Sequence, residues 1–174
     1  MSALASNPAK NRFSTDLAYP SLEVVRLAPE WRGGLQQFFK DLNESGDDVF
    51  FSPHPTDVES IRRVAAHDGK DIYYLLIEQG KTVGYGMLRG WDEGYQIPSL
   101  GLAIHPSVRG QGLGKMLMGF LHLQAFRRGA EKVRLRVNST NDKALKLYKG
   151  LGYVFEEDPH QVDLLVGFKD LGTE

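Results

Sequence analysis

The chain has 174 residues, of which 41% are hydrophobic and 25% charged, and its formal net charge at pH 7 is -1. This composition is that of an ordinary globular protein, and the near-zero charge does not indicate nucleic acid or a membrane as a partner. The absence of cysteine excludes a disulfide framework, a thiolate metal site and a cysteine nucleophile, and it agrees with a cytoplasmic location.

The domain organisation predicted from the sequence is simple. Residues 1–15 are polar and rich in small residues, and they lack the apolar core of a signal peptide, so we expect a flexible N-terminal tail. Residues 16–174 contain no internal repeat and no linker, and their length suits a single domain.

The first third of the chain predicts one strand and two helices. An alternating segment at 21–27 predicts the strand, and Pro29 opens a helical pattern directly after it. The segment 50–55 contains two prolines and is expected to be a loop. Thr56, with Glu59 three residues later, predicts a capping box at the start of the second helix.

The middle of the chain predicts a meander of three strands followed by a helix. Strands are expected at 72–78 and 81–89, joined by a two-residue turn, and a third strand at 95–104. A long amphipathic helix follows a glycine-rich stretch and ends at Gly129.

The last third predicts a strand at 132–137, a helix at 141–151 that Gly152 ends, and two strands at 153–157 and 164–169. The complete order is β-α-α-β-β-β-α-β-α-β-β. Antiparallel hairpins thus lead into a β-α-β crossover, which predicts an α/β (α+β mixed) protein with one mixed sheet and helices on both of its faces.

A glycine-rich turn joins the third meander strand to the long helix, and it reads Arg109-Gly110-Gln111-Gly112-Leu113-Gly114. The start of a helix offers backbone N–H groups without intrahelical partners, and glycine removes side chains that would hold a ligand away from them. The turn therefore predicts an anion site suited to a pyrophosphate. The alternative is a helix start that merely tolerates glycine.

Two other phosphate-binding motifs do not fit this turn. A P-loop requires Ser or Thr after Gly-Lys, whereas Met116 follows Lys115 here. A dinucleotide-binding fingerprint requires the spacing G-x-G-x-x-G, which the three glycines of the turn do not have.

Two motifs together resemble the GNAT superfamily of acetyl-CoA-dependent N-acetyltransferases. The family signature Q/R-x-x-G-x-G/A is matched by Arg109, Gly112 and Gly114, and the stretch 141–153 is similar to the family's N-x-x-A-x-x-L-Y-x-x-x-G-F/Y. The resemblance implies the acyl-CoA N-acyltransferase fold, a mixed and mostly antiparallel twisted sheet of about seven strands with a splayed central V.

The resemblance also implies acetyl-CoA as cosubstrate and no metal. Backbone groups of the strand before the turn would pair with the pantetheine arm, and the amides of the turn would hold the pyrophosphate. The residues expected to bind the cofactor are Leu102, Ala103, Ile104, Arg109, Gly110, Gln111, Gly112, Leu113, Gly114, Lys115 and Asn141.

Tyr148 would be the general acid that protonates the departing thiolate, as the resemblance implies. A hydroxyl near the sulfur would stabilise the developing charge. On helical spacing alone, the alternative is an aromatic side chain packed on the apolar face of its helix.

The general base is the point at which the sequence departs from the family. Many members carry a glutamate where this chain has Pro98, which cannot accept a proton. Asp92 and Glu93 in the preceding turn, and His54 between two prolines, are candidate substitutes, with Glu93 and His54 as candidate bases or acceptor contacts. An ordinary solvated turn, an ordinary loop histidine and deprotonation through ordered water are the alternatives.

The predicted activity is direct transfer of acetyl through a ternary complex to a primary amine of a small molecule, an amino sugar or a peptide. Trp91 and Tyr95 flank the turn near the expected acceptor site and are candidates to close over the acceptor. The alternative function is a non-catalytic acyl-CoA-binding sensor on the same fold. We expect a monomer or a homodimer.

Overall fold

A computed structural model describes residues 21–46 and 49–172, so the tail predicted at 1–15 lies outside the described residues. Seven strands form one sheet in the order β1-β2-β3-β4-β5-β7-β6. Neighbouring strands are antiparallel except β4 and β5, which are parallel. The predicted mixed, mostly antiparallel sheet is therefore confirmed.

The order of elements also agrees with the sequence. The strands are β1 (Leu22–Arg26), β2 (Ile72–Glu78), β3 (Lys81–Arg89), β4 (Ser99–Ile104), β5 (Lys132–Asn138), β6 (Val154–Glu157) and β7 (Leu164–Asp170). The helices are α1 (Arg32–Glu44), α2 (Val58–Ala65), α3 (Leu113–Arg127) and α4 (Asp142–Gly150), with short 3-10 turns η1 (Pro29–Trp31) and η3 (Pro106–Val108). Among the described residues, no helix combines the length and the apolar character needed to cross a bilayer.

The start of β4 differs from the prediction. The strand begins at Ser99 rather than at Tyr95. The N–H of Tyr95 bonds to the carbonyl of Gly90 at 2.8 Å, which closes a turn instead of extending a ladder. Pro98 then lacks an N–H for strand pairing, so regular pairing with β3 starts only after it.

The cap of α2 also differs from the prediction. Thr56 is not the N-cap residue; Asp57 is, and its carboxylate accepts a hydrogen bond from the N–H of Ser60 at 3.0 Å. Both residue types cap helices well, and the cap falls one residue later than the capping-box pattern indicates.

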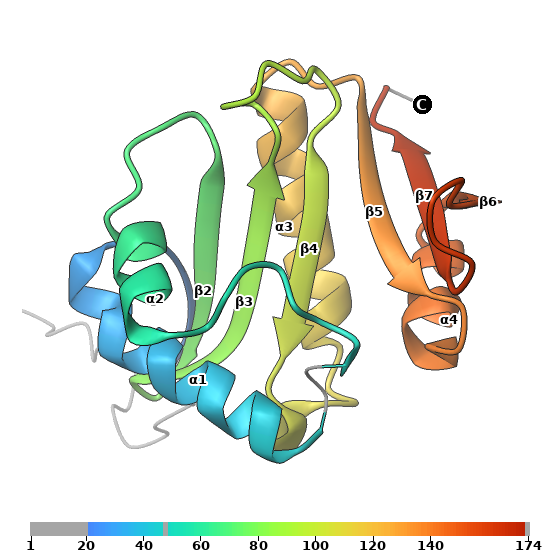
Figure 1. Ribbon diagram of the computed structural model, residues 1–174. Helices are drawn as coiled ribbons and strands as arrows, with labels where there is room; N and C mark the ends of the chain where they lie inside the picture. The colour runs from blue at the N-terminus through green and yellow to red at the C-terminus, as the bar shows by residue number, and fades with distance from the viewer. Residues whose placement is uncertain (1–20, 47–48, 173–174) are drawn as a thin grey trace, which may run out of the picture.

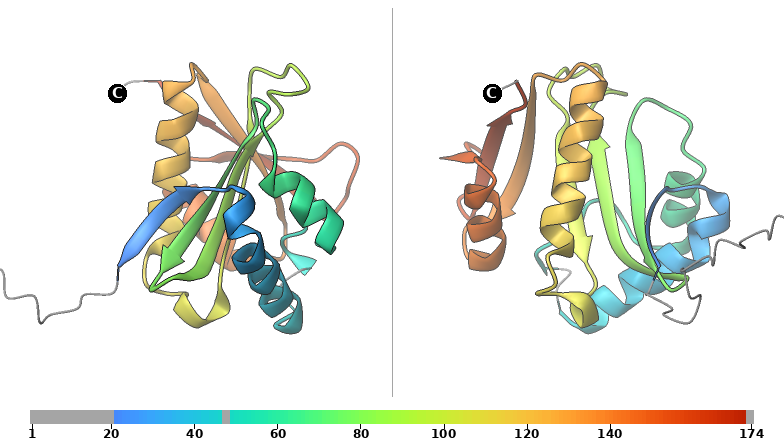
Figure 2. Two further views of the ribbon diagram at one scale, coloured as in Figure 1. Left: turned by 90° about the vertical axis from the view of Figure 1, so that its left-hand side faces the viewer. Right: turned by 180° about the vertical axis from the view of Figure 1, so that it is seen from behind.

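Helices cover both faces of the sheet, as predicted (Figures 1 and 2). α1 and α2 lie on the face toward the viewer in Figure 1, where Phe38 and Phe39 pack against Tyr73 and Leu75 of β2. α3 and α4 lie on the opposite face. We call these the front and the back of the sheet.

The back core includes a close approach between α3 and β3. A Cβ atom built on Gly86 would lie 3.0 Å from Cδ1 of Leu121 and 3.4 Å from Cδ2 of Leu117. Because glycine has no side chain, these two leucines of α3 rest directly on the backbone of β3.

The sheet opens between β4 and β5. These two strands pair at a single position, Ser99 opposite Arg134, where the N–H of Arg134 donates to the carbonyl of Pro98 at 3.0 Å. Beyond that position they diverge, and Figure 1 shows them separating toward the start of α3. This gap is the splayed V that the resemblance implies.

Candidate active site at the gap between β4 and β5

The backbone of β4 presents polar groups to the gap. The N–H of His105 donates to the carbonyl of Val83 in β3 at 2.9 Å, which fixes the alternation of hydrogen bonds along this pair of strands. Ala103 therefore directs its backbone groups to β3, whereas Leu102 and Ile104 direct theirs toward β5. Of the three β4 residues predicted to contact a pantetheine arm, the structure brings the backbone of two to the gap.

The glycine-rich turn ends where α3 begins. Gly110 and Gly112 have φ angles of 79° and 82°, in the left-handed region that favours glycine. Gly112 is the N-cap of α3, and no side chain caps the helix there. A Cβ atom built on either glycine would meet nothing within 4 Å, so the amides at this helix start lie on an open side of the molecule.

Arg109 ties the turn to the strand before it. Its Nε donates a hydrogen bond to the carbonyl of Ile104, the last residue of β4, at 3.0 Å. The side chain of this signature residue thus holds the glycine-rich turn against the end of the strand that borders the gap.

Helix α4 lies next to the start of α3 at the open end of the gap. The side-chain oxygen of Asn141 accepts a hydrogen bond from the N–H of Ala144 at 3.2 Å and caps α4. A Cβ atom on Gly114 would lie 3.6 Å from Cδ2 of Leu147 and 3.8 Å from Cγ1 of Ile104. The start of α3, the end of β4 and the inner face of α4 therefore converge.

Tyr148 stands next to this point of convergence, on α4. Its ring is half-buried against the back core, 5.8 Å from the ring of Tyr153. Burial raises the pKa of the Tyr148 phenol to about 12, so the phenol keeps its proton at neutral pH. The packing alternative and the acid role predicted for this residue are compatible, because both place it on the inner face of α4.

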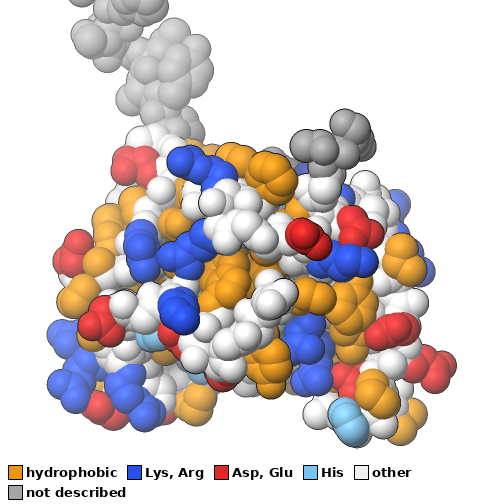
Figure 3. Space-filling model, turned by 90° about the horizontal axis from the view of Figure 1, so that it is seen from above, with side chains coloured by type: hydrophobic (Ala, Val, Ile, Leu, Met, Phe, Trp, Pro, Cys, Tyr) orange, Lys and Arg blue, Asp and Glu red, His pale blue; other side chains and the backbone are white. Residues whose placement is uncertain are grey.

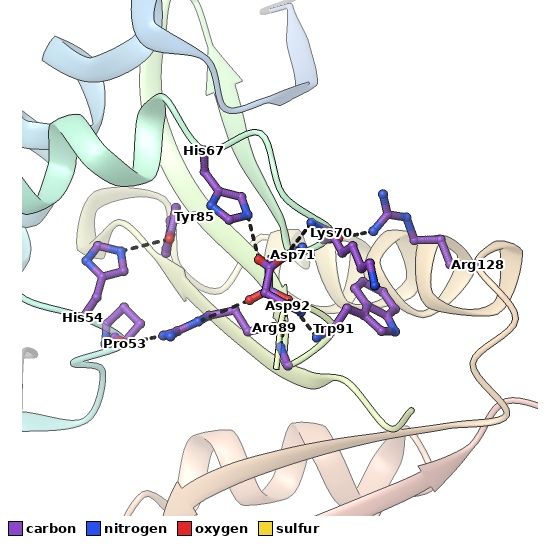
Figure 4. Close-up of polar contacts among 11 residues, drawn as sticks. Pro53, His54, His67, Lys70, Asp71, Tyr85, Arg89, Trp91, Asp92 and Arg128 are labelled. Carbon is purple, nitrogen blue, oxygen red and sulfur yellow. Dashed lines mark hydrogen bonds and ion pairs between the residues drawn. The ribbon is translucent and has the colours of Figure 1, made fainter. Parts of the chain in front are cut away.

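His54 anchors the loop between α1 and α2 to the sheet (Figure 4). Nδ1 lies 2.8 Å from the carbonyl oxygen of Pro55, which only accepts, so Nδ1 carries the hydrogen. In the neutral ring Nε2 then accepts from the hydroxyl of the buried Tyr85, at 3.0 Å. Burial lowers the pKa of His54, which favours this neutral form.

Asp92 has structural partners. Its carboxylate accepts from the N–H of Lys70 at 2.7 Å and lies 2.9 Å from Nε2 of His67. The hydrogen bond from Lys70 is the main cause that lowers the pKa of Asp92. Glu93, next in the same turn, is exposed.

Asp71 is a buried structural residue near the site that the sequence did not indicate. It is buried, and Oδ1 accepts from the amides of Gly90 and Trp91 at 2.9 Å each and of Asp92 at 3.3 Å. This carboxylate therefore holds the turn that follows β3 (Figure 4). An aspartate before a strand carries no local signal of partners twenty residues away.

Trp91 and Tyr95 share a surface pocket with Lys70 and Arg128. The guanidinium of Arg128 lies 5.0 Å from the centre of the Trp91 ring. This pocket borders the loop after α3, and so it lies at the other end of that helix from the glycine-rich turn. The structure thus separates these aromatic residues from the predicted pyrophosphate site by the length of α3.

Within residues 21–46 and 49–172, no group of three or more His, Cys, Asp or Glu side chains is placed to hold a metal ion.

Comparisons with known proteins all find acetyltransferases. The model of the acetyltransferase (GNAT) family matches residues 35–153. An acetyltransferase of Sodalis glossinidius is 30% identical over 97 residues, which cover 56% of this chain and 66% of that relative's length. The match thus spans slightly less than two thirds of the relative.

Solved structures share the fold at low sequence identity. PaiA N-acetyltransferase from Thermoplasma acidophilum, solved in complex with coenzyme A, has a TM-score of 0.74 at 15% identity and covers 86% of this chain and 99% of its own. An acetyltransferase of the GNAT family from Streptococcus pneumoniae has a TM-score of 0.68 at 19% identity, with coverage of 87% and 100%. The family model, the glycine-rich turn and the splayed sheet agree, and the chain belongs to the GNAT family of acetyltransferases.

Proposed function

We propose that this protein transfers an acetyl group from acetyl-CoA to a primary amine of a small molecule, an amino sugar or a peptide, by direct transfer within a ternary complex. The observation that carries the proposal is the gap between β4 and β5. Backbone groups of Leu102 and Ile104 face it, and it ends at an α3 N-terminus that no side chain caps. We also propose that residues 16–174 form one domain.

The gap and the turn fit the two parts of coenzyme A that most need protein partners. A pyrophosphate suits the amides of residues 110–115, because the open N–H groups and the dipole of α3 favour an anion there. An extended pantetheine arm, with its amide groups, suits the edge of β4 as an added strand would. Bound acetyl-CoA would supply an activated acyl group as a thioester.

Tyr148 is assigned the general acid role. Its neutral phenol, held on α4 beside the end of the gap, is the group that can donate a proton to a leaving thiolate. The raised pKa keeps the phenol protonated across the neutral range, so its O–H can donate a hydrogen bond to the sulfur as negative charge develops there.

The acceptor amine is assigned to the front of the sheet, because α3 and α4 cover the back. The hydrogen-bond geometry supports His54 as an anchor of the front loop, since Tyr85 already donates to its Nε2 lone pair. Glu93, exposed on its turn, and ordered water at the front remain the candidates that deprotonate the amine.

Two measurements test the proposal. Calorimetric titration with coenzyme A should show binding, and an assay of free thiol in the presence of acetyl-CoA and a panel of amines should show amine-dependent release. Binding without release from any amine class would favour the acyl-CoA-binding sensor. A well-folded protein that does not bind coenzyme A would refute both functions.

A further inference from the structure

Three residues form a row across three neighbouring strands. Arg89 of β3 lies opposite Ser99 of β4, and Ser99 lies opposite Arg134 of β5. Directly opposed residues in a sheet project from the same face. Because Arg89 donates a hydrogen bond from its guanidinium to the carbonyl of Pro53 in the front loop, at 2.8 Å, that face is the front. We call Arg89, Ser99 and Arg134 the arginine row.

The arginine row marks the closed end of the gap. Ser99 and Arg134 are the one position at which β4 and β5 pair, and the strands diverge directly beyond it. The row therefore borders the gap on the side opposite to α3, which is the side left for an acceptor.

The charge of Arg89 is only loosely matched inside the protein. Its Nε lies 4.0 Å from Oδ2 of Asp71 and forms no hydrogen bond there. The other oxygen of Asp71 accepts from the three amides of residues 90–92, so that carboxylate is stabilised without the guanidinium. Arg89 can accordingly contact another anion at little cost to its existing contacts.

Arg134 forms no ion pair with any described residue, and its guanidinium lies 5.8 Å from the centre of the Tyr95 ring. Arg136, two residues along the same face of β5, is already matched by the buried Asp158, with Nε and Oδ2 3.1 Å apart. Figure 3, which looks down on this end of the molecule, shows Lys and Arg side chains beside the hollow at the lower edge of the view. Arg134 therefore places a cation without a carboxylate partner at the front mouth of the gap, and Arg89 adds a second cation, 4.0 Å from the carboxylate of Asp71.

We propose that the acceptor carries an anionic group, a carboxylate or a phosphate, in addition to its amine, and that this group binds over Ser99 between Arg89 and Arg134. Neighbouring strands are about 4.8 Å apart, so two arginine side chains two strands apart can converge on one oxyanion. Ser99 adds a hydroxyl donor between them. The inference rests on the proposed acetyltransferase function.

The row also sets the size of the acceptor. From Ser99 to Leu102, whose backbone faces the gap, β4 rises by about 10 Å at roughly 3.3 Å per residue. An acceptor that bridges this distance has its anionic group several bonds from its amine, so aminohexanoate fits better than an α-amino acid.

The test compares acceptors in matched pairs. Aminohexanoate is compared with hexylamine, and aminobutyl phosphate with aminobutanol, in the thiol-release assay at saturating acetyl-CoA. We expect the anionic member of at least one pair to have a kcat/KM at least about tenfold higher, and the pair that shows it distinguishes a carboxylate from a phosphate. Equal values within both pairs would overturn the inference.

Substitutions in the arginine row test whether it causes the preference for anionic acceptors. In Arg134→Gln the advantage of the anionic acceptor should disappear, chiefly through KM, while Arg134→Lys should keep part of it. Arg127→Gln, an exposed arginine of α3 on the back, is the matched control and should behave as wild type. If Arg134→Gln slows both members of a pair equally, the inference is wrong.

Binding measurements keep the two proposals apart. Coenzyme A affinity is measured for wild-type protein and for every variant. If wild-type protein did not bind coenzyme A, this result would contradict the acetyltransferase function and not the arginine row. If wild-type protein acetylates no member of either pair, the same pairs are titrated into protein saturated with coenzyme A. Tighter binding of the anionic members supports the inference, and equal binding or no binding contradicts it.

Discussion

Burial of Tyr148 raises the pKa of its phenol to about 12, and the residue needs only its hydroxyl for the role assigned to it. Tyr148→Phe keeps the ring that packs in the back core and removes the proton donor. We expect kcat to fall by about 10²–10⁴-fold, as is typical for loss of a general acid, with the KM for acetyl-CoA nearly unchanged. Initial rates at varied acetyl-CoA, with thermal unfolding as the check on folding, measure this. A variant that retains its kcat would contradict the assignment.

His122 of α3 makes the fold sensitive to acid. Its Nε2 lies 2.8 Å from the hydroxyl of Tyr153, and burial, with a smaller effect of Lys169, lowers its pKa from 6.5 to about 4. The unfolded chain therefore binds more protons than the folded one between these pH values, so the free energy of unfolding falls as pH drops from 6.5 toward 4. Because the ring is partly exposed, we expect a loss of about 1–2 kcal/mol from this residue.

Urea unfolding of wild-type protein and of His122→Gln, each at pH 7.5 and about pH 5, measures this effect. The variant should lose less stability between the two conditions than wild type does. His54, whose pKa is also lowered by burial, contributes in the same direction, so only the difference between the proteins counts. The exposed His160 gives the control His160→Gln, and an equal acid sensitivity in all three proteins would rule the explanation out.

Two glycines, one at the N-cap of α3 and one in its middle, should respond oppositely to substitution by alanine. Gly112 has a φ of 82°, which costs an alanine about 1–2 kcal/mol. Gly119 lies inside the same helix with open space around it, where alanine should stabilise by up to about 1 kcal/mol.

Coenzyme A titrations of the two variants extend this comparison to function. Gly112→Ala should weaken binding, because it moves the amides at the helix start, and Gly119→Ala should leave binding unchanged. Chemical unfolding gives the two stabilities in parallel. Tight coenzyme A binding by Gly112→Ala would show that the turn is not the anion site.

The gap divides the sheet of the molecule into β1–β4 and β5–β7. A ligand that lies in the gap would add contacts to both parts, and coenzyme A at 100 times its Kd should raise the free energy of unfolding by about 2.7 kcal/mol. Amide hydrogen exchange localises the contacts. The N–H groups of Leu102 and Ile104 should exchange more slowly with coenzyme A, whereas that of Ala103, bonded to β3, should change little. Uniform protection of all three would contradict the direction assigned to this backbone.

Local patterns in the sequence predicted the order of elements and the glycine-rich turn, because periodicity and glycine act over a few residues. The cap of α2 was misplaced by one residue, since Thr56 and Asp57 are both good caps and only the chain path selects one. The sequence does not predict the arginine row, because strand register brings Arg89 and Arg134 together from positions 45 apart along the chain. The sequence therefore predicted the features that depend on neighbouring residues. The acceptor side of the site depends on strand register, which joins residues far apart in the chain, and so it was not predicted.

The bare backbone at Gly86 has a consequence for ligand affinity. Since Leu117 and Leu121 rest on it, the thickness of one residue in β3 sets how deeply α3 is seated, and the glycine-rich turn is rigidly attached to that helix one turn earlier. A methyl group at position 86 would press on the side chains of Leu117 and Leu121, and these leucines, or the helix that carries them, would have to give by a few tenths of an ångström. To the extent that the helix rather than the leucine side chains yields, a change at position 86 in β3 would alter the affinity for a diphosphate at the start of α3.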